Sequence, residues 1–394
     1  MIRQYLSKFL RKSETSGLAN PQAWLKGIED VGESWSGVEI TPEGSLASST
    51  VAACVRLLSE SIASLPLHVY RRDGNGKVRA PEHALYSLLH DKPNPYQTSY
   101  TWRAHMVTCV LLHGNAYSIV ERDAGGGVVA LWPVDPRCVV IKSDGGGMYY
   151  EVRIRGEKKE YGFDEVLHIK GPSLDGITGR SIISLAKQGI ALDLAQVQFG
   201  ASLYKNKARP GLILKSPQAL GPEAKEKLRD SFSEKFSGAL NAGKIVVLEG
   251  GLEIDKVGFS ADDAQFLQSR QFSVQDICRW FKVNPHLVGD PSRLAYASSE
   301  AEFNAYLVHS LGPWLVNIQA EMNATLLPDR TSFLVEFDPN GMARGSQVER
   351  YAAYEKGIAA GFLTVADVRA AENLPFLPGT DQLPSTKEVQ NVAA

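Results

Sequence analysis

The segment from Ser181 to Tyr204 constrains the fold of this chain more than any other. Its pattern predicts one long helix, yet its only charged side chains are Lys187 and Asp193. The large apolar residues fall all round the helix, and a helix that is apolar on every face must be buried on every face. Exposing half of them would be costly, at roughly 1.5–3 kcal/mol per large aliphatic side chain. We therefore expect neighbouring subunits to bury this helix through Ile182, Leu185, Ile190, Leu192, Leu194, Val197 and Phe199.

A membrane span is the competing interpretation of this segment, but its Gln, Ser, Asp and Lys content argues against one. No apolar run in the chain approaches the ~20 residues that cross a bilayer. The basic start of the chain lacks the apolar core of a signal peptide, so we interpret it as a partly ordered tail, with a membrane-surface helix as the alternative. We expect a cytoplasmic protein with no membrane partner.

The charge balance limits how the protein could meet nucleic acid. Lys plus Arg number 42 against 44 Asp plus Glu, for a formal net charge of -2. A protein that grips nucleic acid over its whole surface would be strongly basic. Any DNA contact is therefore expected to be local, or of a kind that lets DNA slide.

The first half of the chain predicts an α+β region behind a loosely ordered lead-in over residues 13–45. Helical spacing marks Ser48–Ala63, Glu82–His90 and Ser99–Leu112. LPLHVYRR reads as a strand that ends in a DGNG turn. Five further strands are predicted at NAYSIVER, VVALWPV, RCVVIK, MYYEVRI and EVLHIKG, and the glycine triplets at 125–127 and 145–147 are interpreted as hairpin loops.

The second half begins, after Pro210, with a compact β-α-β-β pattern that looks like an insertion between two long helices. Its predicted elements are the strand GLILK, a helix over Gly221–Phe236, and the strands KIVVLEGG and LEIDKVGF. A second long helix is predicted from Ser260 to Phe281 and stops before Asn284-Pro285.

The last part of the chain predicts a kinked helix, one strand and a helical end. A capping box of Ser299 and Glu302 starts a helix that extends to Leu327, and Gly312-Pro313 is expected to kink it. FLVEFD follows as a strand. The end is predicted to be helical over Gln347–Ala360 with Gly361 as its C-cap, a second short helix from Thr364 and Asp367, and a loose tail after Leu374.

Motifs for catalysis, cofactors or metals are weak or missing. Residues 238–245 match a Walker A loop except at Ile245, where a magnesium-binding Ser or Thr is needed, and a helix leads into a strand instead of the reverse. His105 and His113 are interpreted as surface or packing residues. The four cysteines, 54, 109, 138 and 278, lack zinc spacing and are expected to be buried free thiols in a reducing compartment. We predict no catalytic, cofactor or metal site.

One irregular stretch between the long helices is a candidate for DNA contact because it carries an arginine and a tyrosine. Its residues are Asp290, Pro291, Ser292, Arg293, Leu294, Ala295, Tyr296, Ala297 and Ser298. Any surface loop could carry these side chains, so its position between two long helices is what raises interest.

Several long strings, in order, resemble the portal proteins of tailed bacteriophages, in the HK97-like family. They are KPNPYQTSYTWR, LLHGNAYS, LWPVDPRCVV, VLHIKGPSLDGITGRSII, GKIVVLEGGLEI, DAQFLQSRQFSVQDICRWFKVNPHLVGD and LGPWLVNIQAEMN. The resemblance covers about residues 46–375.

The resemblance implies a ring-forming portal fold, usually of twelve subunits, with this division of the chain. Residues 46–178 would be the wing, rejoined by a strand at 332–338. Residues 179–209 and 260–289 would be the two stem helices, with the clip at 210–259. The tunnel loop would be 290–298, the tunnel helix 299–327 and the crown 343–375, with flexible segments at 1–45 and 376–394.

The family also implies the partners and the place of action. Double-stranded DNA would be packaged and ejected through the ring, which would sit at one capsid vertex of the virion after assembly in the host cytoplasm. The clip would dock the large terminase subunit and later the head-tail adaptor, and the major capsid protein would surround the ring. We expect a neutral or mildly acidic channel wall, since many cations would hold DNA still. The alternatives are another ring-forming head-tail connector without a translocation role and, more remotely, a nucleotide-binding α/β enzyme.

Overall fold

The structure is a computed structural model of the 394-residue chain. It describes residues 34–74, 76–144, 147–205, 213–215, 221, 223, 226, 253–255, 262–290, 302, 304–339, 347–372 and 374–383. All statements below concern these residues.

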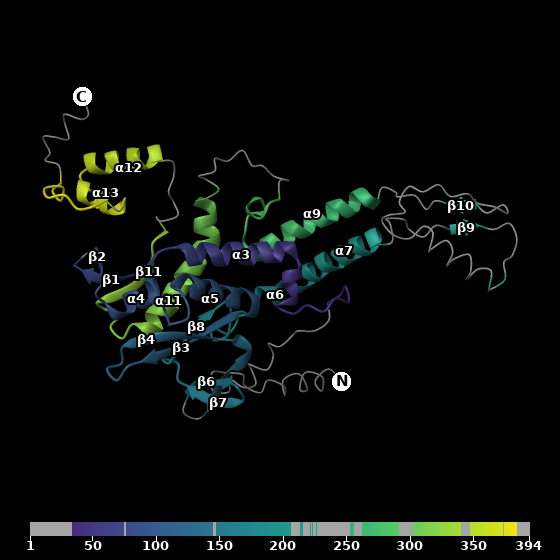
Figure 1. The fold of residues 1–394 in the computed structure, drawn as a ribbon, viewed down its shortest axis with the longest axis horizontal. Coiled ribbons are helices and arrows are strands. Elements are labelled where there is room, and N and C mark those ends of the chain that lie inside the picture. Colours follow the sequence, from purple (N-terminus) through teal and green to yellow (C-terminus); the bar gives the residue numbers. More distant parts are fainter. Residues whose placement is uncertain are drawn as a thin grey trace, which may run out of the picture.

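Helices and antiparallel sheets together build the body of the molecule, as the sequence predicted (Figure 1). Its three sheets have the strand orders β11-β1-β2, β4-β3-β8 and β5-β6-β7. The helices of this region are α3 (Ser49–Ser64), α4 (Ala84–His90) and α5 (Ser99–His113). Its strands are β1 (Leu67–Asp73), β2 (Gly76–Arg79), β3 (Asn115–Arg122), β4 (Val128–Val134), β5 (Val139–Asp144), β6 (Gly147–Ile154), β7 (Glu157–Tyr161), β8 (Val166–Lys170) and β11 (Phe333–Phe337).

The core of the body forms where α3 and α5 pack together and against the sheets. Trp102 on α5 is fully buried, and its indole nitrogen donates to the Ser118 hydroxyl of β3. Arg103 is also buried, and its guanidinium donates to the main-chain oxygens of Ser99 and Leu65. Burial lowers the pKa of this guanidinium to about 10. A second, smaller core lies around Tyr117 and Tyr150 under the β5-β6-β7 sheet.

The first glycine triplet lies in a hairpin loop, as predicted, because residues 125–127 join β3 to β4. Of the second triplet, Gly147 begins β6 and pairs with Asp144 of β5, while residues 145–146 lie outside the described residues. Two strands were missed. β2 and β7 are fully or largely exposed and rich in charge, so no apolar alternation marks them, and backbone pairing with β1 and β6 defines them. The expected strand RCVVIK begins later than predicted, because Pro136–Cys138 form a 3-10 turn capped by Asp135.

Residues 34–47 differ from the loosely ordered lead-in that we expected. Ile40 is buried in the main core, and a short 3-10 helix, η1 (Gly44–Ala47), leads directly into α3. The main-chain nitrogen of Trp35 donates to Gln188 on the predicted stem segment. This part of the chain is therefore attached to the body.

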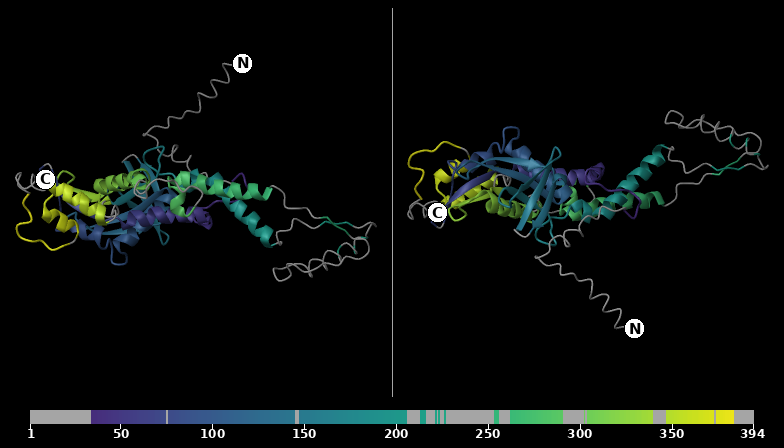
Figure 2. Two further views of the ribbon diagram at one scale, coloured as in Figure 1. Left: turned by 90° about the horizontal axis from the view of Figure 1, so that it is seen from above. Right: turned by 90° about the horizontal axis from the view of Figure 1, so that it is seen from below.

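Two long helices, α7 (Lys187–Lys205) and α9 (Asp262–Phe281), project side by side from the body (Figures 1 and 2). We call them the stem pair. The single helix predicted from Ser181 is interrupted, since α6 (Ile182–Leu185) ends at Ala186 before α7 begins. Beyond the stem pair, β9 (Ile213–Lys215) and β10 (Glu253–Asp255) pair antiparallel, in the positions of two predicted strands. The predicted strand KIVVLEGG and most of the helix at Gly221–Phe236 lie outside the described residues.

The helix predicted to kink at Gly312-Pro313 is irregular at that point. A π-helical stretch, η6 (Tyr306–Leu311), precedes α11 (Gly312–Leu326), and the Gly312 main-chain nitrogen donates to Leu307. Pro313 has no N–H to donate, so the turn before it widens by one residue. Most of the predicted capping box lies outside the described residues.

The chain then returns to the body and ends in a pair of helices. β11, in the position of the predicted strand FLVEFD, pairs antiparallel with β1. The final helices are α12 (Gln347–Ala359) and α13 (Val365–Ala371); Gly361 has a φ of 73° and Thr364 forms a capping box with Asp367, both as predicted. Pro375 and Thr380, in the tail expected to be loose after Leu374, accept hydrogen bonds from Arg369 and Ala366 of α13.

Candidate assembly surface on the stem pair

The contact between α7 and α9 includes a cluster of polar side chains. The Gln196 side chain donates to Ser269 at 2.8 Å and accepts from Ser273 at 3.2 Å. Gln196 and Ser273 are both buried. At Gly189, an added Cβ would lie 2.8 Å from an Asp276 carboxylate oxygen, so the helices approach closely there. Hydrogen bonds and a small residue therefore add to the apolar packing of Ile190 and Ile277, which lie in the same core.

The one acidic residue of α7 is buried against the body. Asp193 accepts a 2.6 Å hydrogen bond from the Ser48 hydroxyl, which is also the N-cap of α3 and accepts from Val51. A carboxylate at a helix N-terminus is favoured by the exposed N–H groups and the helix dipole. This pair anchors the base of α7.

The apolar residues of α7 divide between the protein interior and the solvent. Of the seven residues expected at subunit interfaces, Ile182 and Ile190 are buried within the protomer and Leu194 packs partly against its core. For Ile182 and Ile190, the expectation of burial by neighbouring subunits is wrong, because they lie in the core of their own chain, where α6 contacts α5 and α9 and α7 contacts α9. The other four are exposed in the single chain: Leu185, Leu192 (48%), Val197 (39%) and Phe199 (57%).

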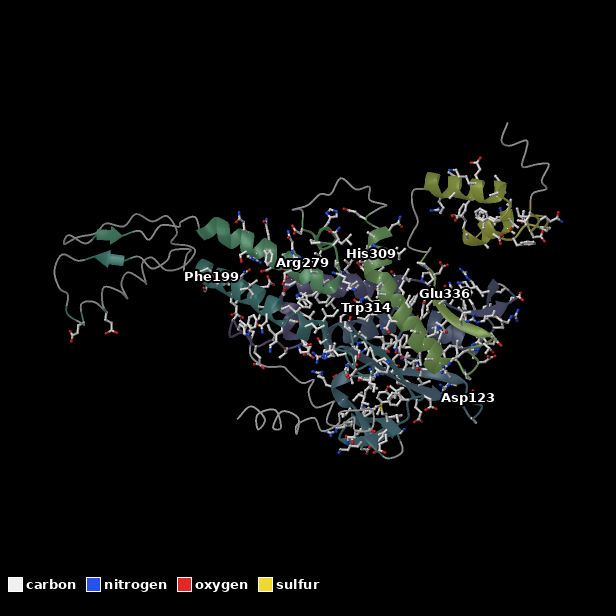
Figure 3. All side chains as sticks on the ribbon, turned by 180° about the vertical axis from the view of Figure 1, so that it is seen from behind. Asp123, Phe199, Arg279, His309, Trp314 and Glu336 are labelled. Carbon is white, nitrogen blue, oxygen red and sulfur yellow. The ribbon has the colours of Figure 1, made fainter. Side chains whose placement is uncertain are left out.

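The exposed residues lie on two faces of the helix. Leu192 and Phe199 are seven residues apart and share one stripe, whereas Val197 lies roughly 140° away at 100° per residue. Figure 3 shows Phe199 on the part of α7 that projects beyond the body. On α9, Phe272 (57%) and Trp280 (45%) add to the exposed apolar surface, and the Arg279 guanidinium lies over the Phe272 ring. Both α9 residues were missed by the sequence analysis, although the aromatic residues of α9 were visible in its pattern.

Three glycines join the body to the stem segment. The main-chain nitrogen of Gly171 donates to Gly114 at 2.7 Å, and Gly179 lies directly against both. A Cβ on Gly179 would collide with the Gly114 oxygen and lie 2.5 Å from the Gly171 nitrogen. Gly114 also has a φ of 79°, which favours glycine. The three backbone segments can approach this closely only because all three positions are glycines, which have no side chain.

A buried polar network lies beside this crossing. The Asn115 side-chain oxygen accepts from the Gly179 main-chain nitrogen, and its amide nitrogen donates to the Gly179 oxygen. The same side-chain oxygen accepts from His168 Nε2 at 2.9 Å, so Nδ1 of His168 accepts from the Tyr150 hydroxyl. Burial lowers the pKa of His168 to about 3 and raises the pKa of Tyr150. His168 is therefore a neutral, structural residue.

The candidate DNA-contact stretch is described only at its first residue. Asp290 follows a 3-10 turn, η4 (Pro285–Val288), that Asn284 caps after the end of α9. The other eight residues of that stretch, from Pro291 to Ser298, lie outside the described residues, as does the Walker-like segment 238–245.

The remaining candidates show no assembled chemistry in the described part of the chain. His105 is exposed on α5 and contacts the Cys109 sulfur, while His113 lies 3.8 Å from Glu43. Within the described ranges, no group of three metal-binding side chains occurs. No described helix is long and apolar enough to span a bilayer.

Comparison with known families decides the class of protein. The family model described as "Phage portal protein" matches residues 49–373. The chain belongs to the phage portal protein family.

Relatives agree with this assignment over most of the chain. The probable portal protein of Streptomyces phage phiC31 is 35% identical over 364 residues, covering 87% of this chain and 78% of that protein. The portal protein of Enterobacteria phage HK97 is 29% identical over 350 residues, covering 87% and 82%. The HK97-like resemblance is confirmed, and the family implies a role in DNA packaging.

Solved portal structures share the fold. An HK97 family phage portal protein from Corynebacterium diphtheriae matches with a TM-score of 0.59 and 17% identity, covering 79% of this chain and 98% of that one. A chain from the virion of a native gene transfer agent particle matches with a TM-score of 0.61 and 24% identity, covering 92% and 100%. The mixed helix and strand architecture is therefore that of portal proteins.

Proposed function

We propose that this portal protein assembles into a closed ring, usually of twelve copies, whose central channel passes double-stranded DNA into and out of a phage capsid. The observation that carries the proposal is the arrangement of the stem pair. Leu192, Phe199 and Val197 are exposed on two faces of α7, and Phe272 and Trp280 add exposed aromatic surface on α9. A concentration of large exposed apolar side chains is typical of a surface that another subunit covers.

Two separate exposed faces favour a ring over a two-fold dimer. A dimer uses one self-complementary patch, whereas a ring subunit uses two different patches, one for each neighbour. The stripe of Leu192 and Phe199 and the face of Val197 fit the second case. A twelve-fold ring is further supported by a structural relative of 23% identity, which comes from the neck of a gene transfer agent particle computed with C12 symmetry.

Residues 210–259 would then form the clip that docks the large terminase subunit and later the head-tail adaptor. Residues 290–298 would form the tunnel loop, 299–327 the tunnel helix and 343–375 the crown, with the major capsid protein outside the wing. The ring would belong to the virion and be assembled in the host cytoplasm, with a structural rather than an enzymatic role. The near-balanced charge of 42 basic and 44 acidic residues supports a channel in which DNA slides.

Native mass measurement of the purified full chain, followed by electron microscopy, tests the proposal. We expect one assembly at about twelve times the protomer mass of 43.0 kDa, with a continuous channel wide enough for B-DNA. A stable, monodisperse monomer at micromolar concentration would contradict it. A ring closed at its centre would instead support the second candidate, a head-tail connector without a translocation role.

A DNA-binding measurement tests the channel separately from the ring. If the channel lets DNA slide, duplex DNA should bind weakly and with little dependence on salt. Each phosphate neutralised by a lysine or arginine changes log K by about 0.9 per decade of salt, so a steep slope would mean many fixed contacts. Tight and steeply salt-dependent binding by the assembled ring would count against translocation.

A further inference from the structure

Two cysteines that are far apart in sequence meet in the core. Cys54 on α3 and Cys278 on α9 are 224 residues apart, and their sulfur atoms lie 4.0 Å from one another. Both side chains are completely buried. The expectation of buried free thiols is confirmed for Cys54, Cys109 and Cys278, whereas Cys138 is only partly buried. The sequence did not reveal that Cys54 and Cys278 lie next to one another.

We propose that Cys54 and Cys278 form an oxidisable dithiol that closes into a disulfide in an oxidising medium and covalently joins helix α9 of the stem pair to helix α3 of the body. In a thiol-buffered compartment the two residues stay reduced and the contact is non-covalent. Intracellular proteins generally keep such thiols reduced, whereas structures outside the cell are exposed to oxidants.

The geometry favours disulfide formation over metal binding by the two cysteines. A disulfide needs a sulfur–sulfur distance of about 2.05 Å, so the two sulfurs must approach by roughly 2 Å. Each sulfur moves on a single Cα–Cβ rotation, and the two helices already pack together near these residues. Two thiols alone supply too few ligands for a tetrahedral zinc site, which takes four.

The chemistry is a two-step exchange with a low-molecular-weight disulfide, RSSR. The thiolate of Cys278 attacks one sulfur of RSSR, forms a mixed disulfide and releases RS⁻. The Cys54 thiol gives its proton to RS⁻ and attacks the Cys278 sulfur, which releases the second RS⁻; this thiolate takes up from water the proton that Cys278 lost at the start. The protein loses two electrons and two protons, and RSSR becomes two RSH.

Either sulfur can donate in this contact. We write Cys278 as the first to react because its contact with Cys54 lowers the pKa of Cys278, whereas the same contact raises the pKa of Cys54. A thiolate is the attacking species in such exchanges. Because both sulfurs are buried, reaction requires a local opening between α3 and α9 and is expected to be slow.

The disulfide would lie where α3 contacts both α9 and η6. The Tyr306 hydroxyl on η6 donates to Ser61, so α3 also contacts the helix that follows the 291–301 segment. Cys278 lies three residues before the end of α9, close to where that segment begins. If the ring proposed above exists, the disulfide would fix the stem to α3 before the predicted tunnel loop, while the hydrogen bond from Tyr306 to Ser61 holds the chain to α3 after it. This consequence rests on the proposed function, whereas the disulfide itself does not.

The test uses the purified full chain, fully reduced and then freed of reductant, in a Cys138→Ser background that prevents bonds between molecules. One sample is incubated with glutathione disulfide under native conditions, and another is refolded from denaturant in the same reagent. We expect loss of two of the three remaining thiols, a mass decrease of about 2 Da and one linked peptide pair containing Cys54 and Cys278. Refolding should give the product quickly, because the thiols are then accessible.

Variants separate this result from general oxidation. Cys54→Ser and Cys278→Ser should each abolish the linked pair, whereas Cys109→Ser, another buried cysteine, should leave it unchanged. If all three thiols persist after refolding, or if only mixed disulfides with glutathione form, the proposal is wrong. Ring formation is measured independently by native mass, so either proposal can fail while the other stands.

Discussion

Ser48 and Asp193 are 145 residues apart in sequence, yet they share a buried hydrogen bond of 2.6 Å between the start of α3 and the middle of α7. Ser48→Ala should remove both the helix cap and the partner of a buried carboxylate. Loss of a cap costs about 1 kcal/mol, and an unsatisfied buried acceptor costs about 1–3 kcal/mol. We expect a decrease of about 2–4 kcal/mol in the free energy of unfolding, measured by urea denaturation. Ser49→Ala, at the neighbouring exposed serine, should change it by less than about 0.5 kcal/mol.

Leu192 and Leu194 are two residues apart on α7 but should respond differently to the same substitution. Leu192 is 48% exposed in the protomer, so Leu192→Asp should leave the protomer folded and prevent assembly. Leu194 packs against the core, so Leu194→Asp should destabilise the protomer itself by several kcal/mol. Circular dichroism measures the fold and native mass the assembly. Normal rings from Leu192→Asp would refute the assembly surface.

Gly179→Ala should disrupt the junction between the body and the stem segment. The new methyl group would meet the Gly114 oxygen and the Gly171 nitrogen, which are main-chain atoms with no rotamer to change. We expect a loss of about 3 kcal/mol or more, or insoluble protein, because overpacking forces the backbone to shift. Gly76→Ala is the matched control, since its Cβ would meet only the Asp73 oxygen, at 3.6 Å. Equal thermal stability of the two variants would contradict the close approach of the Gly114, Gly171 and Gly179 backbones.

Stability should fall as the solution becomes acidic because two histidines are buried in the neutral form. Burial lowers the pKa of His168 to about 3 and that of His68 to about 4, from 6.5. The stabilisation from the neutral form is present above pH 6.5 and is lost as pH falls toward those values, since the unfolded chain binds the protons first. For His168 the loss between pH 7 and pH 5 is about 2 kcal/mol.

Urea denaturation across this pH range measures the effect. His168→Gln should reduce the slope of stability against pH, with the remaining slope due in part to His68. A slope in His168→Gln equal to that of the unmodified chain would mean that His168 is not held neutral.

Local sequence patterns predicted much of the fold. The predicted limits of β3 and β4 agree with the structure, and so do the Gly361 cap and the Thr364 capping box, because alternation, glycine and capping residues act within a few positions. β2 and β7 were missed because edge strands need no apolar face. Their pairing depends on partners that the local pattern does not reveal.

The exposed apolar surface of the stem pair was predicted only in part, because it depends on contacts between elements that are far apart in sequence. Helical periodicity shows that α7 is apolar on many sides but cannot say which sides its own chain covers. That depends on α3 and α9, which are far away in sequence, and on polar contacts such as Gln196 with Ser269. The meeting of Cys54 with Cys278 was likewise hidden, since only the packing of α3 on α9 brings them together.

The π-helical stretch at Tyr306–Leu311 changes how the residues before it are rotated about the helix axis relative to those after it. One surplus residue turns everything before it by about 100° relative to an uninterrupted α-helix. The direction in which the chain enters this helix therefore depends on the number of residues in the π-helical turn as well as on their chemistry. Removing a single position there would re-aim the preceding segment while leaving the composition almost unaltered.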